Sequence, residues 1–155
     1  MTAETQTPET VETTIQNLIP DSHQSVIETV IGSMAQNESA MVHENEHGYL
    51  WKFQYGSVEV FVQLTRETDE DLFTVWASVL TFPVRDEAGL TRKLLTMNWS
   101  ETLETRFAIM NDAVVVVLQR AVADLSPGEI SRAITLVATI ADDNDEILQE
   151  TFGNV

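Results

Sequence analysis

The feature that most constrains the fold of this chain is a long amphipathic helix predicted near its C-terminal end, from Leu125 to Glu146. Ser126 can cap this helix, Pro127 suits its first position, and Glu129 completes a Ser-x-x-Glu capping box. Apolar residues then recur at helical spacing on one broad face: Ile130, Ala133, Ile134, Val137, Ala138, Ala141 and Leu148. Such a stripe is typical of a helix that packs on another layer of the protein.

Two predicted β-hairpins supply strands for that layer. In the first, residues 49–64, Gly56 and Ser57 form a two-residue loop of type II′. The resulting register pairs Tyr49, Trp51, Phe53 and Tyr55 with Leu64, Val62, Val60 and Val58 on one face. The opposite face receives Leu50, Lys52 and Gln54, paired with Gln63, Phe61 and Glu59.

The second predicted hairpin turns at Asn111 and Asp112. Its register pairs Phe107 with Val116 and Ile109 with Val114 on the core face. Residues 114–118 are apolar on both faces, which indicates an interior strand.

Three further elements complete the order αβββαββα. A helix is predicted from Asp21 or Ser22 to Gln36, a third strand over residues 72–81, and a helix over residues 87–97. We therefore expect an α+β single domain over residues 21–155, with a five-stranded, mostly antiparallel sheet on which the first and third helices pack. Residues 1–20 are expected to form a mobile acidic segment with a short amphipathic stretch at residues 11–19.

The net charge of −17 at pH 7 is the outlying property of the composition. No Lys or Arg precedes Lys52. Such a charge repels phosphate backbones and anionic lipid headgroups, so we expect neither nucleic-acid nor membrane partners. Basic partners and cations are favoured.

The chain has no cysteine, which excludes disulfides, thiolate metal ligands and cysteine nucleophiles. Its first twenty residues lack the basic and apolar regions of a secretory signal, and no apolar run reaches the roughly 20 residues of a membrane span. A cytoplasmic protein is the expectation.

Residues 43–47 read His-Glu-Asn-Glu-His and match the H-E-x-x-H pattern of zinc metalloproteases. The motif requires a helix that places both histidines on one side, whereas Gly48 and a predicted strand follow here at once. His23 is the only other histidine. We expect a solvated loop and no metal or other cofactor.

The acidic run Asp142-Asp143-Asn144-Asp145-Glu146 lacks the glycine and the glutamate of an EF-hand loop. It lies within the helical pattern, where Asp142 and Glu146 repel each other toward the unfavourable end of the helix dipole. A basic neighbour, a partner or an ion is one way to offset that cost, and a solvated face is the alternative.

The tryptophans Trp51, Trp76 and Trp99 are most economically core residues. The hairpin registers, however, leave apolar side chains on the sheet face opposite the core, and strand alternation adds residues of the third strand to them. We expect this reverse face to be covered by the protein's own elements, by a second subunit or by a partner. The candidate partner-binding residues are Phe61, Trp76, Leu72, Leu80, Val115 and Val117.

Several stretches resemble the YbjN-domain family, in particular its small acidic cyanobacterial-type members. They are residues 51–56 (WKFQYG), 75–84 from Val-Trp to Phe-Pro-Val, Asn98-Trp99, and above all 124–143 from Asp-Leu-Ser-Pro-Gly-Glu-Ile to Ala-Asp-Asp. The resemblance covers about residues 22–152. It implies a fold like that of type III secretion chaperones, which are small, acidic, often dimeric and bind unfolded segments of a client. It carries no catalytic residues.

These observations favour a non-enzymatic protein-binding module, chaperone-like or regulatory, that forms a homodimer. One alternative is a metal-dependent enzyme that uses the His43/His47 region or the carboxylates of residues 142–146. Another is a structural subunit of a larger assembly.

Overall fold

The computed structural model describes residues 22–35 and 40–154. Its elements, in chain order, are α2 (His23–Met34), β1 (Ala40–Asn45), β2 (Gly48–Tyr55), β3 (Val58–Leu64), β4 (Leu72–Thr81), α3 (Glu87–Ser100), β5 (Arg106–Met110), β6 (Ala113–Ala121) and α4 (Pro127–Phe152). This confirms the α+β class and the predicted order of helices and strands. The amphipathic stretch expected at residues 11–19 lies outside the described residues.

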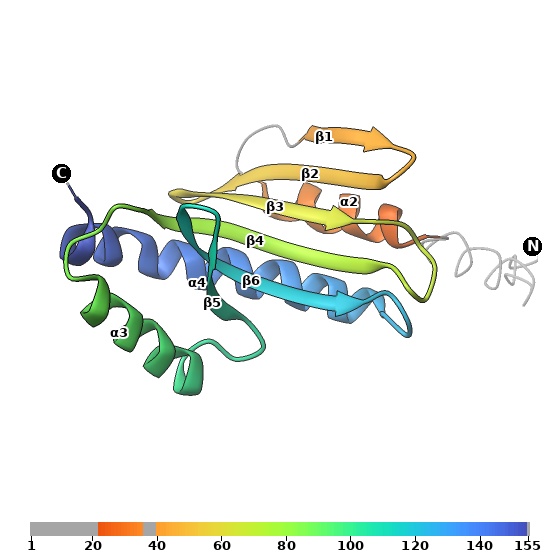
Figure 1. The fold of residues 1–155 in the computed structure, drawn as a ribbon. Helices are drawn as coiled ribbons and strands as arrows, with labels where there is room; N and C mark the ends of the chain where they lie inside the picture. Colours follow the sequence, from red (N-terminus) through yellow and green to blue (C-terminus); the bar gives the residue numbers. More distant parts are fainter. Residues whose placement is uncertain (1–21, 36–39, 155) are drawn as a thin grey trace, which may run out of the picture.

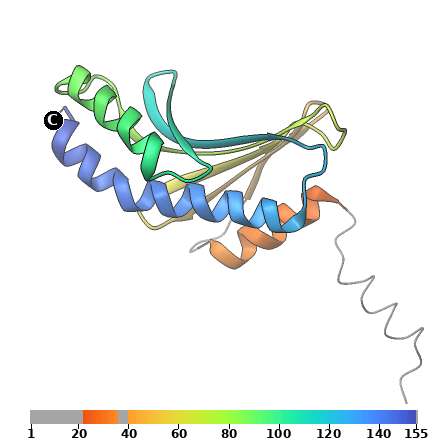
Figure 2. The same cartoon turned by 90° about the horizontal axis from the view of Figure 1, so that it is seen from below.

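All strands pair antiparallel in one sheet of order β1-β2-β3-β4-β6-β5 (Figure 1). The five predicted strands are present, and β1 adds a sixth at the edge beside β2. Figure 2 shows α2 and α4 together on one side of the sheet. The first and third predicted helices therefore form the second layer, as expected, while α3 stands at one end beside β5.

Both hairpin registers are confirmed, including Trp51 with Val62 and Phe107 with Val116. Gly56 has φ of +55°, the left-handed value that the first position of a type II′ turn requires. A Cβ at Gly56 would also lie 2.1 Å from Oδ1 of Asp142. Glycine is therefore needed here for its conformation and for the close approach of α4.

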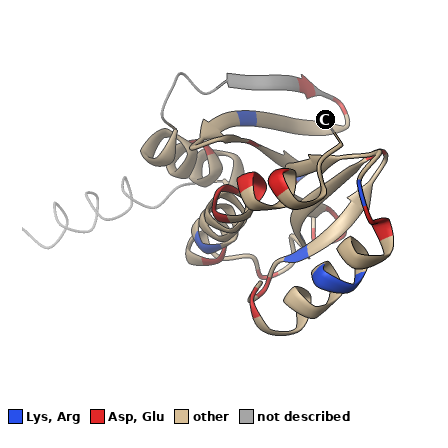
Figure 3. Cartoon of the chain, turned by 90° about the vertical axis from the view of Figure 1, so that its left-hand side faces the viewer, with Lys and Arg blue, Asp and Glu red and all other residues tan. Residues whose placement is uncertain are grey.

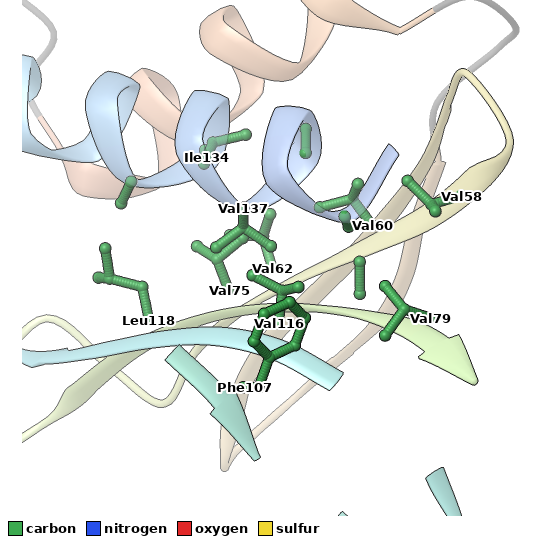
Figure 4. Packing of buried hydrophobic residues seen from close by; sticks show 14 of the residues in the cluster. Val58, Val60, Val62, Val75, Val79, Phe107, Val116, Leu118, Ile134 and Val137 are labelled. Atoms are coloured by element: carbon green, nitrogen blue, oxygen red, sulfur yellow. The ribbon is translucent and has the colours of Figure 1, made fainter. Parts of the chain in front are cut away.

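The core fills the space between α4 and the sheet (Figure 4). Val60, Val62 and Val75 are fully buried on the sheet side, and Ile134 and Val137 are fully buried on the helix side. This packing explains why the alternating strand pattern and the helical stripe appear together in one sequence: each is the apolar face of one layer.

The capping box predicted at the start of α4 is present: Ser126 accepts a hydrogen bond from the backbone N–H of Glu129, and Glu129 accepts one from that of Ser126. The helix runs six residues beyond the predicted end, to Phe152. Leu148 and Phe152 continue the buried stripe, and the backbone N–H of Arg85 donates to the carbonyl oxygen of Phe152 at 2.7 Å.

Candidate partner-binding face

One face of the sheet carries no helix among the described residues. We call it the open face, because its side chains point away from α2 and α4, as their register positions and strand alternation dictate. Its apolar members are Leu50, Phe61, Leu72, Trp76, Ala108, Met110, Val115 and Val117. The reverse face expected from the hairpin registers is thus present, and neither α3 nor another described helix covers it (Figure 2).

The centre of the open face is an aromatic pair from neighbouring strands. Phe61 of β3 lies directly opposite Trp76 of β4. Their ring centroids are 5.4 Å apart and their planes differ by 11°, so the rings are stacked. Both side chains are partly exposed. A stacked pair loses little conformational freedom when a partner binds, and aromatic side chains are enriched in the centres of protein interfaces.

The stacked pair belongs to a row that crosses five strands. Lys52 pairs with Phe61, Phe61 with Trp76, Trp76 with Val117, and Val117 with Arg106. With about 4.8 Å between strands, the row is roughly 19 Å long. Lys52 and Arg106 are exposed. The row therefore has an apolar centre with a basic residue at each end, and Lys52 Nζ lies 3.9 Å from a carboxylate oxygen of Glu59 on the neighbouring strand.

Around the aromatic pair, exposure varies among the candidate residues. Leu72 is 40% exposed and Met110 39%, whereas Val115 is buried between its register neighbours on β4 and β5. Val117, beside Trp76, is partly exposed. The open face therefore has a partly exposed apolar centre at Phe61, Trp76 and Val117, next to the buried Val115. A polar row of Gln63, Thr74 and Gln119 separates this centre from Leu72.

The placement of Leu80 on this face is wrong. The register of β4 against β6 shifts between Ser78 and Leu80, which is a β-bulge, so Leu80 pairs with Val114 of the core face. Leu80 and Val79 are both buried, at 4% and 1% exposure. The bulge inserts one residue, so strict alternation beyond Ser78 predicts the wrong side for Leu80. We therefore remove it from the candidate site.

The expectation that all three tryptophans belong to the core is also only partly correct. Trp51 is buried at 3% exposure, but Trp99 is 89% exposed near the end of α3. Ile109, expected on the core face, is 60% exposed, and it lies on β5, an edge strand of the sheet. Both residues belong to a second exposed apolar region, on α3 and β5.

The His43–His47 segment does not form the helix of a zinc protease. His43 and Glu44 lie in β1, and residues 46 and 47 form the turn to β2, so the expected loop is in part an edge strand. His23 is engaged elsewhere: its Nε2 lies 3.0 Å from the carbonyl oxygen of Leu125. Over the described ranges, no group of three His, Cys, Asp or Glu residues is arranged to hold a metal ion.

The acidic run in α4 has a partner that the sequence did not suggest. The backbone N–H of Ser57 donates to Asp142 Oδ1 at 2.9 Å. The Ser57 hydroxyl lies 2.7 Å from Asp145 Oδ2, and Asp145 is only 3% exposed. Donors of the β2–β3 turn thus offset the cost of these carboxylates. This contact between turn and helix is structural.

A hollow of about 310 Å³ lies between β6 and α4, and two of its lining side chains are arginines. Arg132 donates to both carboxylate oxygens of Glu104, at 2.9 and 3.0 Å, and Arg120 pairs with Glu129. The hydrogen bond from Arg132 lowers the pKa of Glu104. Because each arginine already has a carboxylate, the hollow has no cation available for an anionic ligand.

Comparison with known proteins gives a family match and a solved structure with a similar fold. A family model described as "YbjN: Putative bacterial sensory transduction regulator" matches residues 23–150. A chain from the crystal structure of the ExsC-ExsE complex is similar over 80% of this chain and 91% of that chain, with a TM-score of 0.51 and 16% sequence identity. At that identity the likeness concerns the fold, and it confirms the expected similarity to type III secretion chaperones. A search of curated proteins found no significant match.

Among the described residues, no helix is long and apolar enough to cross a membrane.

Proposed function

This chain belongs to the YbjN family, and on that premise we propose that it is a non-enzymatic protein-binding module whose partner docks on the open face. A regulatory or chaperone-like role is supported by the description of the family and by a structural neighbour that is itself part of a two-protein complex. The observation that carries the proposal is the partly exposed Phe61–Trp76 stack on a sheet face without a described helix.

The chemistry of the open face defines the kind of partner. A polypeptide segment with apolar anchor side chains would bury Phe61, Trp76 and Leu72, and each large side chain fully removed from water contributes roughly 1.5–3 kcal/mol. Lys52 and Arg106 form a charged rim around this apolar centre, which is the usual composition of an interface. The net charge of −17 favours encounter with a partner that is basic overall, and we expect that encounter to take place in the cytoplasm.

The decisive experiment replaces both aromatic anchors. We expect Phe61→Ser/Trp76→Ser to lose the proteins that the wild type captures from native lysate, because anchor residues each contribute about 2 kcal/mol or more to binding. The variant should stay folded with a lowered thermal midpoint, since both side chains are partly exposed but the stacked pair is lost. Binding of the apolar dye ANS gives a second readout that needs no identified partner, and it should fall in the same variant.

The matched control is Gln63→Ser/Thr74→Ser, a directly paired couple on the same two strands and the same face. This control should retain both the captured proteins and the dye. If the aromatic double variant unfolds while the control does not, Phe61 and Trp76 are core residues and the proposal is wrong. If both variants retain the captured proteins, the partner binds elsewhere.

A further inference from the structure

The described chain begins beside the end of the sheet where the open face starts. Ser22 caps α2, and the backbone N–H of His23 donates to Glu67 Oε1 in the β3–β4 loop at 2.6 Å. This loop leads directly to Leu72, the first residue of β4 and an apolar member of the open face. Figure 1 shows the loop and α3 at opposite ends of the sheet. The residues before Ser22 are therefore attached next to the open face and far from α3.

These preceding residues carry an apolar pattern that matches the open face in length. Apolar residues recur at the spacing of one helical face, at Val11, Ile15, Leu18 and Ile19. A helix over residues 11–19 would measure roughly 12 Å from its first to its last Cα atom. Leu72 and Trp76, four residues apart along β4, are separated by roughly 13 Å. The two ends of the apolar stripe thus have the same separation as the two apolar parts of the open face.

The connection to α2 is long enough for this contact and too short for many others. Two residues separate Ile19 from Ser22, so their Cα atoms lie at most roughly 10 Å apart. That distance allows Ile19 to lie beside Leu72 at the start of β4. Val11 then reaches the aromatic centre of the face.

Charge favours the same surface. Residues 1–21 have no Lys or Arg and four acidic residues, Glu4, Glu9, Glu12 and Asp21. On the other side of the sheet, α2 and α4 together contain seven Asp and Glu residues and one Arg, and Figure 3 shows several acidic residues on α4. At the open-face positions of β2 to β6, the charged residues are two basic and one acidic: Lys52, Arg106 and Glu59. The helix side therefore repels an acidic segment, whereas the open face, at +1, attracts it.

We propose that residues 11–19 of this chain dock on the open face of the same molecule, with their apolar stripe over Leu72 and the Phe61–Trp76 stack. The inference rests on the proposed function, because the segment and the partner use the same surface. A short tether gives the segment a roughly millimolar effective concentration at that surface. A partner must therefore displace it, which keeps the apolar centre covered until a competent partner binds and excludes weakly binding apolar segments.

Fluorescence of Trp76 tests the proposal in the full-length chain. In a Trp99→Phe background the remaining tryptophans are Trp76 and Trp51, and Trp51 is only 3% exposed, so quenching by acrylamide reports mainly on Trp76. We expect Ile15→Ser/Leu18→Ser, the stripe variant, to increase the quenching constant and to shift the emission to longer wavelength. Binding of ANS should rise in the same variant, because more of the apolar centre is then free.

The matched control is Gln16→Ser/Asn17→Ser, which alters two neighbouring residues outside the apolar stripe and should leave quenching and dye binding unchanged. Equal quenching in the stripe variant and its parent would overturn the proposal. So would protection of Trp76 in the parent that is lost on dilution, because the segment would then lie on a second copy of the chain.

The two proposals can fail separately. If the stripe variant leaves quenching unchanged while the Phe61→Ser/Trp76→Ser variant loses its captured proteins, docking of the segment is wrong and the proposed function stands. If the stripe variant exposes Trp76 while the aromatic double variant keeps its captured proteins, the segment covers the open face but the partner binds elsewhere.

Discussion

The hydroxyl oxygen of Ser57, in the β2–β3 turn, lies 2.7 Å from a carboxylate oxygen of Asp145 in α4, 88 residues further along the chain. Its backbone N–H donates to Asp142 in the same helix. This contact joins the tip of the best-defined hairpin to the longest helix. It also explains how an acidic run persists in the C-terminal half of α4, where the helix dipole disfavours negative charge.

Ser57→Ala should therefore destabilise the fold. The change removes the hydroxyl that Asp145 accepts from, and a buried acceptor left without its donor costs about 1–3 kcal/mol. Urea unfolding measures the loss, with Ser78→Ala, at an exposed strand position, as the control. The Ser57→Ala effect should shrink in an Asp145→Asn background. Equal effects in both backgrounds would show that the pair is not coupled.

Gly56→Ala should also destabilise the protein, by more than the 1–2 kcal/mol that a left-handed conformation costs an L-residue. The added methyl group would overlap Oδ1 of Asp142 as well. Gly32→Ala is the matched comparison, because a Cβ at this exposed position in α2 meets nothing within 4 Å. There we expect a gain of about 0.5–1 kcal/mol from the reduced entropy of the unfolded chain. Thermal or urea unfolding of the two variants should give opposite signs, and the same sign would contradict the argument.

The bulge in β4 predicts different costs for two leucines of that strand. Leu80→Ala should cost about 2–5 kcal/mol, because the side chain is 4% exposed and part of the core. Leu72→Ala, at 40% exposure on the open face, should change the free energy of unfolding by about 0.5 kcal/mol or less. If the two variants lose similar stability, Leu80 does not occupy the core position that the bulge gives it.

Stability should also depend on the ionisation of Asp71 in the β3–β4 loop. The hydrogen bond from the Thr68 hydroxyl is the largest cause that lowers the pKa of Asp71 below its ordinary value of 3.8, and the Thr65 hydroxyl adds to it. A carboxyl group whose pKa is lower in the folded than in the unfolded state stabilises the folded state at pH values above the unfolded pKa. This contribution disappears as the pH falls through the lowered folded value.

The measurement for Asp71 is urea unfolding of the wild type and of Asp71→Asn over a series of pH values. The stability difference should be largest at neutral pH and should vanish in acid. Asp69→Asn, in the same exposed loop, serves as the control. A difference that stays constant with pH would mean that Asp71 does not act through its charge.

The sequence by itself determined the features that depend on neighbouring residues. Both hairpin registers, the capping box of α4 and the left-handed Gly56 follow from short-range patterns, because turn chemistry and side-chain alternation act within a few residues. The existence of an apolar sheet face opposite the core follows from the same registers, and alternation in the third strand places Trp76 on that face with Phe61. Their direct pairing across β3 and β4 was found only in the structure.

Only the tertiary structure decided which surfaces stay exposed and which polar groups meet. The side of Leu80 depends on a bulge, and the edge strand β1 depends on backbone pairing with β2; neither requires a distinctive side-chain pattern. The exposure of Trp99 depends on where α3 sits relative to the sheet. The contact of Ser57 with Asp145 depends on how α4 crosses the hairpin. Each of these features is set by packing between elements that are distant in sequence. The spacing of apolar residues along a helix does not indicate whether another element covers that face of the helix.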